Sequence, residues 1–191
     1  KRNTLFLNRG DGTYAEIAQL AGLDATEWSW MPLFLDVDLD GFEDLLVSTG
    51  HTRDSLNADA VEAIMRGRRG RKLSDQEHRE LKKKHFPLLN LHNQAFRNRG
   101  DLTFEDKARE WGFDHVGTSH GMCLADLDND GDLEVIVNHL NDLAGIYRNE
   151  SAAPRVLVRL RGKAPNTQGI GARIRLTGGP VPHGEEMICA G

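Results

Sequence analysis

The sequence predicts a mainly β fold in which a unit of short strands is repeated. Two motifs recur at one offset of 90 residues: NRGDGTYAEIAQLAGL at 8–23 returns at 98–113 as NRGDLTFEDKAREWGF, and DVDLDGFED at 36–44 returns at 126–134 as DLDNDGDLE. The apolar runs around them are short and bounded by turn residues, which is typical of buried strands. Two different motifs that share one offset indicate an internal repeat.

A third motif shows that the repeated unit is shorter than the offset of 90 residues. An aromatic residue stands two positions before Asn at Phe6, Phe96 and Tyr147. The last two are 51 residues apart, whereas the acidic loops are 90 apart, so the first copy carries an insertion of about 39 residues. A unit of about 50 residues built from short strands is the size of one β-propeller blade.

Each unit is expected to contain two hairpins. One encloses the acidic loop, with strands at 33–35 and 45–47 in the first copy and at 122–124 and 135–137 in the second. The other turns at Asn-Arg-Gly-Asp, where Gly and Asp are hairpin signals. The Arg-Gly-Asp tripeptide that integrins read therefore occurs twice, and we interpret it as turn chemistry.

The insertion, about 51–90, predicts a helical hairpin. Val61, Ile64 and Met65 have helical spacing, and the Ser-Asp-Gln-Glu segment at 74–77 is a capping box that starts a second helix. Residues 51–95 hold ten Lys and Arg against six Asp and Glu, a local excess of +4. This is either a basic contact surface for an anionic partner or, as we favour, a solvated face.

Residues 1–150 are thus expected to form a partial propeller, and 151–191 the beginning of a separate β-rich module. Alternation places Val156, Val158 and Leu160 on one face of a strand, a second alternating strand follows at 170–176, and Gly-Gly-Pro at 178–180 turns the chain. The chain begins at Lys without Met and stops within a strand pattern, so we expect a fragment whose missing blades lie elsewhere in the same chain.

The acidic loops are candidate metal sites. In both, Asp holds positions 1, 3 and 5, Gly holds position 6 and a carboxylate holds position 9. Such closely spaced carboxylates repel one another unless a cation neutralises them, and hard oxygens in this number suit calcium. The glycine permits a turn that lets position 7 donate its backbone carbonyl. The predicted Ca²⁺ ligands are Asp36, Asp38, Asp40, Phe42, Asp44, Asp126, Asp128, Asp130, Asp132 and Glu134.

The place of the last carboxylate distinguishes these loops from helix-flanked calcium loops. Those carry their last carboxylate at position 12, whereas here it stands at 9 and a hydrophobic strand follows at once. The pattern therefore predicts a strand-loop-strand site. Asp-Gly turns also occur without metal, and the longer Glu134 suggests a second site that is looser or differently ligated.

At this point the chain resembles a known family. FLDVDLDGFEDLLV and LADLDNDGDLEVIV are similar to FG-GAP/VCBS repeats, the calcium-binding blades of integrin-like β-propellers. The tail, RVLVRLRGKAPNTQGIGARIRL, resembles the opening of an ASPIC/UnbV domain. The resemblance implies a propeller of about seven blades in a secreted, periplasmic or cell-surface protein. It carries no catalytic residues over to this chain.

Two functional hypotheses follow. The first is a calcium-binding scaffold that is not an enzyme and presents a surface to a protein or glycan. The second is a glycan lyase or hydrolase with His51, His120 and His139, which we place near the acidic loops, as candidate groups. These histidines show no zinc-site spacing, so surface or hydrogen-bonded roles are the simpler interpretation. Trp28 and Trp30 either stack on a sugar or, as we favour, pack between blades.

Composition excludes several other classes. The net charge of −5 argues against nucleic acid or an anionic membrane as the main partner. The apolar runs are too short for a transmembrane helix. Cys123 lies in an apolar run and is expected to be buried, with no disulfide to the distant Cys189.

Overall fold

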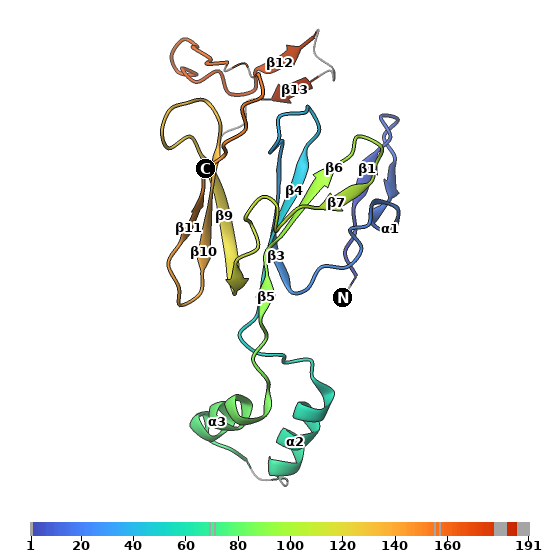
Figure 1. Cartoon of the computed structure of the whole chain (residues 1–191), viewed down its shortest axis with the longest axis vertical. Helices are drawn as coiled ribbons and strands as arrows, with labels where there is room; N and C mark the ends of the chain where they lie inside the picture. The colour runs from blue at the N-terminus through green and yellow to red at the C-terminus, as the bar shows by residue number, and fades with distance from the viewer. Residues whose placement is uncertain are drawn as a thin grey trace.

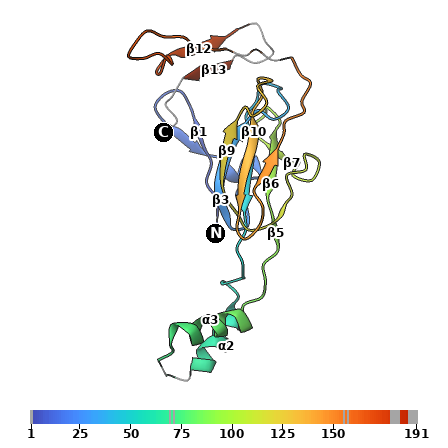
Figure 2. The ribbon, with the colours of Figure 1, turned by 90° about the vertical axis from the view of Figure 1, so that its left-hand side faces the viewer.

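The computed structural model describes residues 2–68, 70, 72–154, 156, 158–177 and 183–186. Two antiparallel sheets lie side by side in the body, a helical hairpin projects from one end, and a small β-hairpin lies at the other (Figures 1 and 2). The mainly β class is thus confirmed. Closure into a propeller stays a prediction.

The larger sheet has four strands in the order β3-β4-β6-β7. The acidic hairpin is β3 (Ser29–Leu35) and β4 (Asp44–Thr49), and the Asn-Arg-Gly-Asp hairpin is β6 (Gln94–Asn98) and β7 (Phe104–Asp106). Leu35 pairs with Asp44, so the ninth loop position is already the first residue of the returning strand. Both expected hairpins therefore form, and they share one sheet although the 51–90 segment separates them in sequence.

The smaller sheet repeats the acidic hairpin. Its order is β11-β10-β9, from β9 (Ser119–Ala125), β10 (Glu134–His139) and β11 (Gly145–Tyr147). A separate hairpin, β1 (Phe6–Asn8) and β2 (Tyr14–Glu16), leads into the short helix α1 (Ala18–Ala21). It corresponds in sequence to β6–β7 at the offset of 90 residues, which supports the internal repeat.

Strand β4 is the centre of the body, and every one of its residues is buried. Leu46 points to a core shared with Val135 and Val137 of the smaller sheet. Leu45 and Val47 point the other way, into a core that includes Ala21 and Leu23 around α1. A strand covered on both faces needs apolar side chains at successive positions, which explains the uninterrupted Leu-Leu-Val run.

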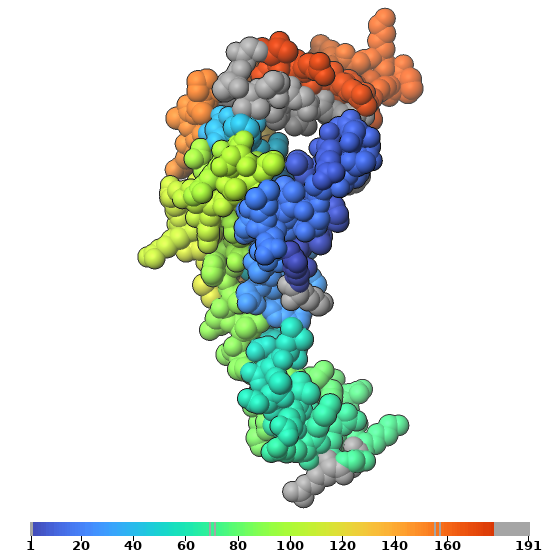
Figure 3. All heavy atoms as spheres, turned by 90° about the vertical axis from the view of Figure 1, so that its right-hand side faces the viewer, coloured from blue at the N-terminus to red at the C-terminus, as the bar shows by residue number. Residues whose placement is uncertain are grey.

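The 51–90 segment contains α2 (Ala58–Arg68) and α3 (Asp75–His85). Ser74 and Glu77 form the expected capping box, in which each side chain accepts the other's backbone N–H. The helices have a small core of their own from Ala60, Ile64 and Phe86, and they form a distinct lobe beyond the body (Figure 3). Two short strands, β5 (Leu91–His92) and β8 (Val116–Gly117), pair at its base.

Three expectations about apolar residues are corrected. Met65 is 66% exposed, because Ile64 alone of that pair faces the small helical core. Cys123 is exposed, because its neighbour Met122 takes the inward position on β9. Val156 and Val158 are exposed and lie outside any strand, since no neighbouring strand pairs with them among the described residues.

The tail forms less sheet than expected. The second alternating strand is shortened to β12 (Arg173–Leu176), which pairs with β13 (His183–Glu186). Its beginning is lost because Gly169 and Gly171 adopt left-handed conformations, with φ of 68° and 82°. The turn expected at 178–180 and Cys189 lie outside the described residues.

The turns of the two Asn-Arg-Gly-Asp segments offer a matched stability test. Gly10 and Gly100 are both left-handed, with φ of 79° and 74°. A Cβ at Gly10 would meet nothing within 4 Å, whereas one at Gly100 would lie 2.7 Å from the Phe42 ring. Gly10→Ala is expected to lower the free energy of unfolding by about 1 kcal/mol and Gly100→Ala by about 2–4 kcal/mol.

Chemical denaturation measures both losses. In a Phe42→Ala background the two glycine substitutions should become equally costly, because the obstructing ring is gone. If Gly10→Ala and Gly100→Ala lowered the free energy of unfolding equally in the unaltered background, the Phe42 ring would not obstruct a side chain at Gly100.

Candidate metal centre

The two acidic loops have the same backbone conformation. Leu39 and Asn129 are left-handed at φ 57° and 61°, and Gly41 and Gly131 follow at 95° and 94°. A Leu in the left-handed region is unfavourable by itself, so the surrounding loop must hold it there. The same left-handed turn in both copies, which Asn129 adopts more readily than Leu39, indicates that the loop geometry, and not only its charge, is repeated.

Hydrogen bonds within the loops repeat as well. The Asp40 carboxylate accepts the N–H of Phe42 at 3.0 Å, and the Asp130 carboxylate accepts the N–H of Asp132 at 3.1 Å. In the first loop Asp36 also accepts the N–H groups of Asp40 and Gly41 at 3.0 and 2.8 Å. These bonds fold the backbone around the carboxylates and gather them on the inner side of the loop.

The carboxylates at position 9 tie each loop to the strands. Asp44 is fully buried and accepts the N–H of Val37 at 2.9 Å and that of Asn98 on β6 at 2.8 Å. Burial raises the pKa of Asp44 to about 6; the N–H donors oppose this, and the charges of Asp38 and Asp36 add to it. Glu134 makes the equivalent bond to the N–H of Leu127 at 2.8 Å.

The structure gathers most of the predicted ligands into two clusters, in each of which the candidate ligand atoms lie within 4.8 Å of one another. Asp44 is not one of the first cluster and Asp126 is not one of the second, while Asp132 joins through its side chain. The backbone-carbonyl role predicted for Phe42 and Asp132 stays a prediction. The clusters are Asp36, Asp38 and Asp40 in the first loop, and Asp128, Asp130, Asp132 and Glu134 in the second.

The donor set fits a hard cation such as calcium. Calcium takes six to eight oxygens, mainly from carboxylates, carbonyls and water. Buried oxygens of Asp38, Asp126 and Glu134 have no hydrogen-bond partner. A buried carboxylate oxygen without a partner is costly, and a bound cation removes that cost.

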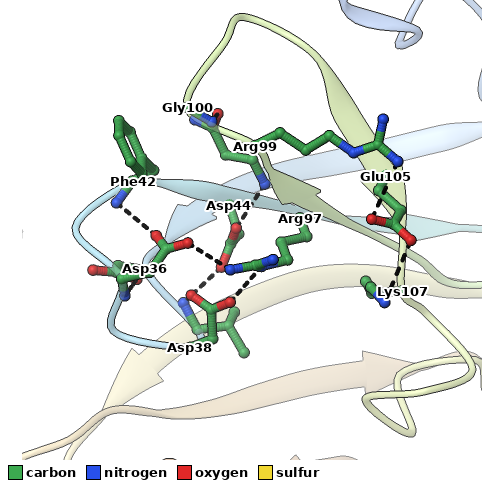
Figure 4. Close-up of polar contacts among 12 residues, drawn as sticks. Asp36, Asp38, Phe42, Asp44, Arg97, Arg99, Gly100, Glu105 and Lys107 are labelled. Atoms are coloured by element: carbon green, nitrogen blue, oxygen red, sulfur yellow. Dashed lines mark hydrogen bonds and ion pairs between the residues drawn. The ribbon is translucent and has the colours of Figure 1, made fainter. Parts of the chain in front are cut away.

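An arginine that the sequence analysis missed reaches each loop from the neighbouring strand. Arg97 of β6 lies 2.5 Å from Asp38 and 2.7 Å from Asp40, as Figure 4 shows for its approach to Asp38. Arg148, just after β11, lies 2.8 Å from Asp128 and 3.5 Å from Asp130. The signal in the sequence was the residue between the aromatic and the Asn of the third motif, which is Arg in two of its three copies.

The first loop is also joined to the chain that follows the second unit. The side chain of Asn149 donates to the carbonyl of Val37 at 3.0 Å, and the hydroxyl of Ser151 donates to the carbonyl of Asp38 at 3.3 Å. The first loop therefore holds a segment that lies beyond the second acidic hairpin, so its shape affects how that segment packs.

The candidate histidines lie at the opposite end of the sheets from the acidic loops, which corrects their expected position. Each acidic loop joins the end of one strand to the start of the next, whereas His51 follows the far end of β4, and His120 and His139 stand at the start of β9 and the end of β10. A six-residue strand spans roughly 20 Å, so these side chains are remote from the carboxylates.

These histidines make ring contacts in three pairs. His51 lies against Trp28 in a tilted arrangement with ring centroids 4.6 Å apart, and His120 meets Trp30 edge-on at 4.7 Å. His139 is buried, stacks on His115 at 3.9 Å, and shares a 2.9 Å hydrogen bond with Ser119. The tryptophans thus pack against imidazoles within this chain.

Comparison with known families agrees with the geometry of the loops. Both repeats match the FG-GAP-like repeat family. The matched regions are residues 1–47 and 90–137, so each contains one acidic loop and ends in the strand that leaves it. The match does not extend to 138–191, and the VCBS and ASPIC/UnbV resemblances stay predictions. No curated protein gives a significant match to the chain.

The stacked pair of His115 and His139 predicts a pH effect. Burial lowers the pKa of His139 below 6.5, the charge of His115 lowers it further, and Asp142 partly opposes both. As the pH falls, the imidazole of His139 is protonated in the unfolded chain before it is protonated in the folded protein. Protonation therefore favours the unfolded chain, and the free energy of unfolding decreases between pH 7 and pH 5.

Denaturation in chelator at several pH values measures this effect. The free energy of unfolding should fall less steeply with decreasing pH in His139→Gln than in the unaltered protein. In the control His78→Gln, on α3, it should fall as steeply as in the unaltered protein. Identical pH profiles for the unaltered protein and His139→Gln would contradict the assignment.

Proposed function

We propose that the chain is part of a calcium-stabilised binding scaffold. The main observation behind the proposal is that two FG-GAP-like loops hold clustered carboxylates in the same backbone conformation, with buried oxygens of Asp38 and Glu134 that lack hydrogen-bond partners. A cation in each loop would neutralise mutual repulsion that otherwise opposes folding.

The carboxylates would divide into two roles. Asp36, Asp38 and Asp40 would hold the ion in the first loop, and the cluster from Asp128 to Glu134 would hold it in the second. Calcium supplies charge neutralisation and a fixed set of oxygen contacts. Asp44 would act through its hydrogen bonds to Val37 and Asn98, which connect the loop to the sheet.

For the partner we propose a protein or a glycan. A cavity of about 430 Å³ beside β3 supports the glycan alternative, because its lining combines Trp28 with the polar side chains of Thr26, Ser29 and Gln94. Sugars bind through stacking on such rings and hydrogen bonds to such groups. No described helix is long and apolar enough to cross a bilayer. An extracytoplasmic location is part of the proposal and rests on the FG-GAP-like repeats.

We further propose that the scaffold has no catalytic activity of its own. His51 and His120 lie against tryptophan rings, and His139 is held against His115 and Ser119, which supports packing roles. A screen of glycan turnover should find no activity in the unaltered protein or in His120→Ala. Activity that His120→Ala abolishes while its circular dichroism is unchanged would overturn the scaffold in favour of an enzyme.

Calcium titration tests the metal proposal directly. At a calcium concentration of one hundred times the dissociation constant, each occupied site should raise the free energy of unfolding by about 2.7 kcal/mol. This appears as a rise in the thermal midpoint. The double substitution Asp38→Asn with Asp128→Asn should abolish the rise. Asp59→Asn with Asp75→Asn removes the same charge from α2 and α3 and should leave it intact. Absence of any shift at millimolar calcium would remove the metal from the proposal.

A further inference from the structure

Arg97 occupies the mouth of the first acidic loop as an internal cation. Two of its nitrogens contact two different carboxylates, Asp38 at 2.5 Å and Asp40 at 2.7 Å. Both carboxylates belong to the cluster that would hold calcium. The Arg97 side chain is 37% exposed, so water reaches part of it while it contacts the cluster.

Its strand fixes this position firmly. Arg97 lies on β6 between Phe96, which is buried in the core around α1, and Asn98, whose backbone N–H donates to Asp44. The side chain of Asn98 donates to the carbonyl of Glu43 at 3.0 Å, which adds a second link between β6 and the loop. The pairing of β6 within the sheet therefore places Arg97 beside the first acidic loop.

Arg148 occupies the equivalent place in the second loop but is held less tightly. One of its nitrogens makes both contacts, at 2.8 Å to Asp128 and 3.5 Å to Asp130, and its side chain is 60% exposed. Two well-aligned donors hold a carboxylate pair more strongly than one shared donor, and greater exposure weakens the attraction further.

We propose that Arg97 and Arg148 are affinity-setting residues that neutralise the loops in the absence of metal and must be displaced when calcium binds. The inference rests on the proposed calcium site. A divalent ion among the carboxylates of Asp38 and Asp40 would repel a guanidinium in contact with the same two groups, and it would compete for the same oxygens. Metal binding is then an exchange of cations in a preformed loop.

Two consequences follow for each loop. Without metal, the arginine stabilises the fold by offsetting repulsion between carboxylates. With metal, its displacement weakens the apparent affinity, and more so at the first loop than at the second. Removing Arg97 should therefore destabilise the metal-free protein and tighten calcium binding, which are opposite effects on the two states.

Isothermal titration with calcium chloride measures the affinity of the first loop in an Asp128→Asn background, in which the second loop should no longer bind calcium. Arg97→Met is expected to tighten calcium binding roughly five- to ten-fold and to lower the thermal midpoint measured in chelator. Arg99→Met is the matched control: it removes the same charge two residues away, where Arg99 contacts Glu105 at 3.2 Å (Figure 4), and should change neither. Arg148→Met in an Asp38→Asn background should tighten the second site by about two-fold.

The outcomes separate this inference from the proposed function. Calcium binding that is unchanged or weaker in Arg97→Met, with its circular dichroism intact, would overturn the competition while leaving the calcium site in place. Binding by Arg97→Met but not by the Asp128→Asn parent would support the competition in its strongest form. Absence of calcium binding by every protein in the set, including the unaltered one, would overturn both proposals.

Discussion

The buried carboxylate of Asp44 is the interaction on which the rest of this structure depends. It is the last residue of the acidic loop and the first of the central strand, and it accepts N–H groups from Val37 in the loop and Asn98 on β6. One side chain therefore sets the size of the loop and the register of the third strand. Because Asp44 is fully buried, its charge depends on these donors for stabilisation.

Core and loop are consequently coupled through β4. Residues that follow Asp44 alternate between the two hydrophobic cores, so the loop leads directly into a strand that packs on both faces. The contacts of Asn149 and Ser151 with the backbone of Val37 and Asp38 extend this coupling to the chain that follows the second repeat. An ion in the first loop would then stiffen the interface between repeats as well as one hairpin, which is the mechanical role expected of a scaffold.

Much of the fold was accessible from local sequence pattern. The hairpins formed where short apolar runs flank a turn, and the capping box began α3, because each depends on neighbours within a few residues. Predictions failed where packing in the sheet decides which face of a strand is covered or whether a strand has a partner. Cys123 is exposed because Met122 takes the inward position on β9, and the valines of the tail have no partner strand among the described residues.

The candidate site divides in the same way. The sequence by itself determined the two loops and their carboxylates, since charge repulsion and glycine turns act within nine consecutive residues. Only the tertiary structure decided which carboxylates cluster, that Asp44 braces a strand, and that the histidines lie at the far end of the sheets. It also brought Arg97 to Asp38, 59 residues away in sequence, because the pairing of β4 with β6 spans the helical segment and no local pattern records that pairing.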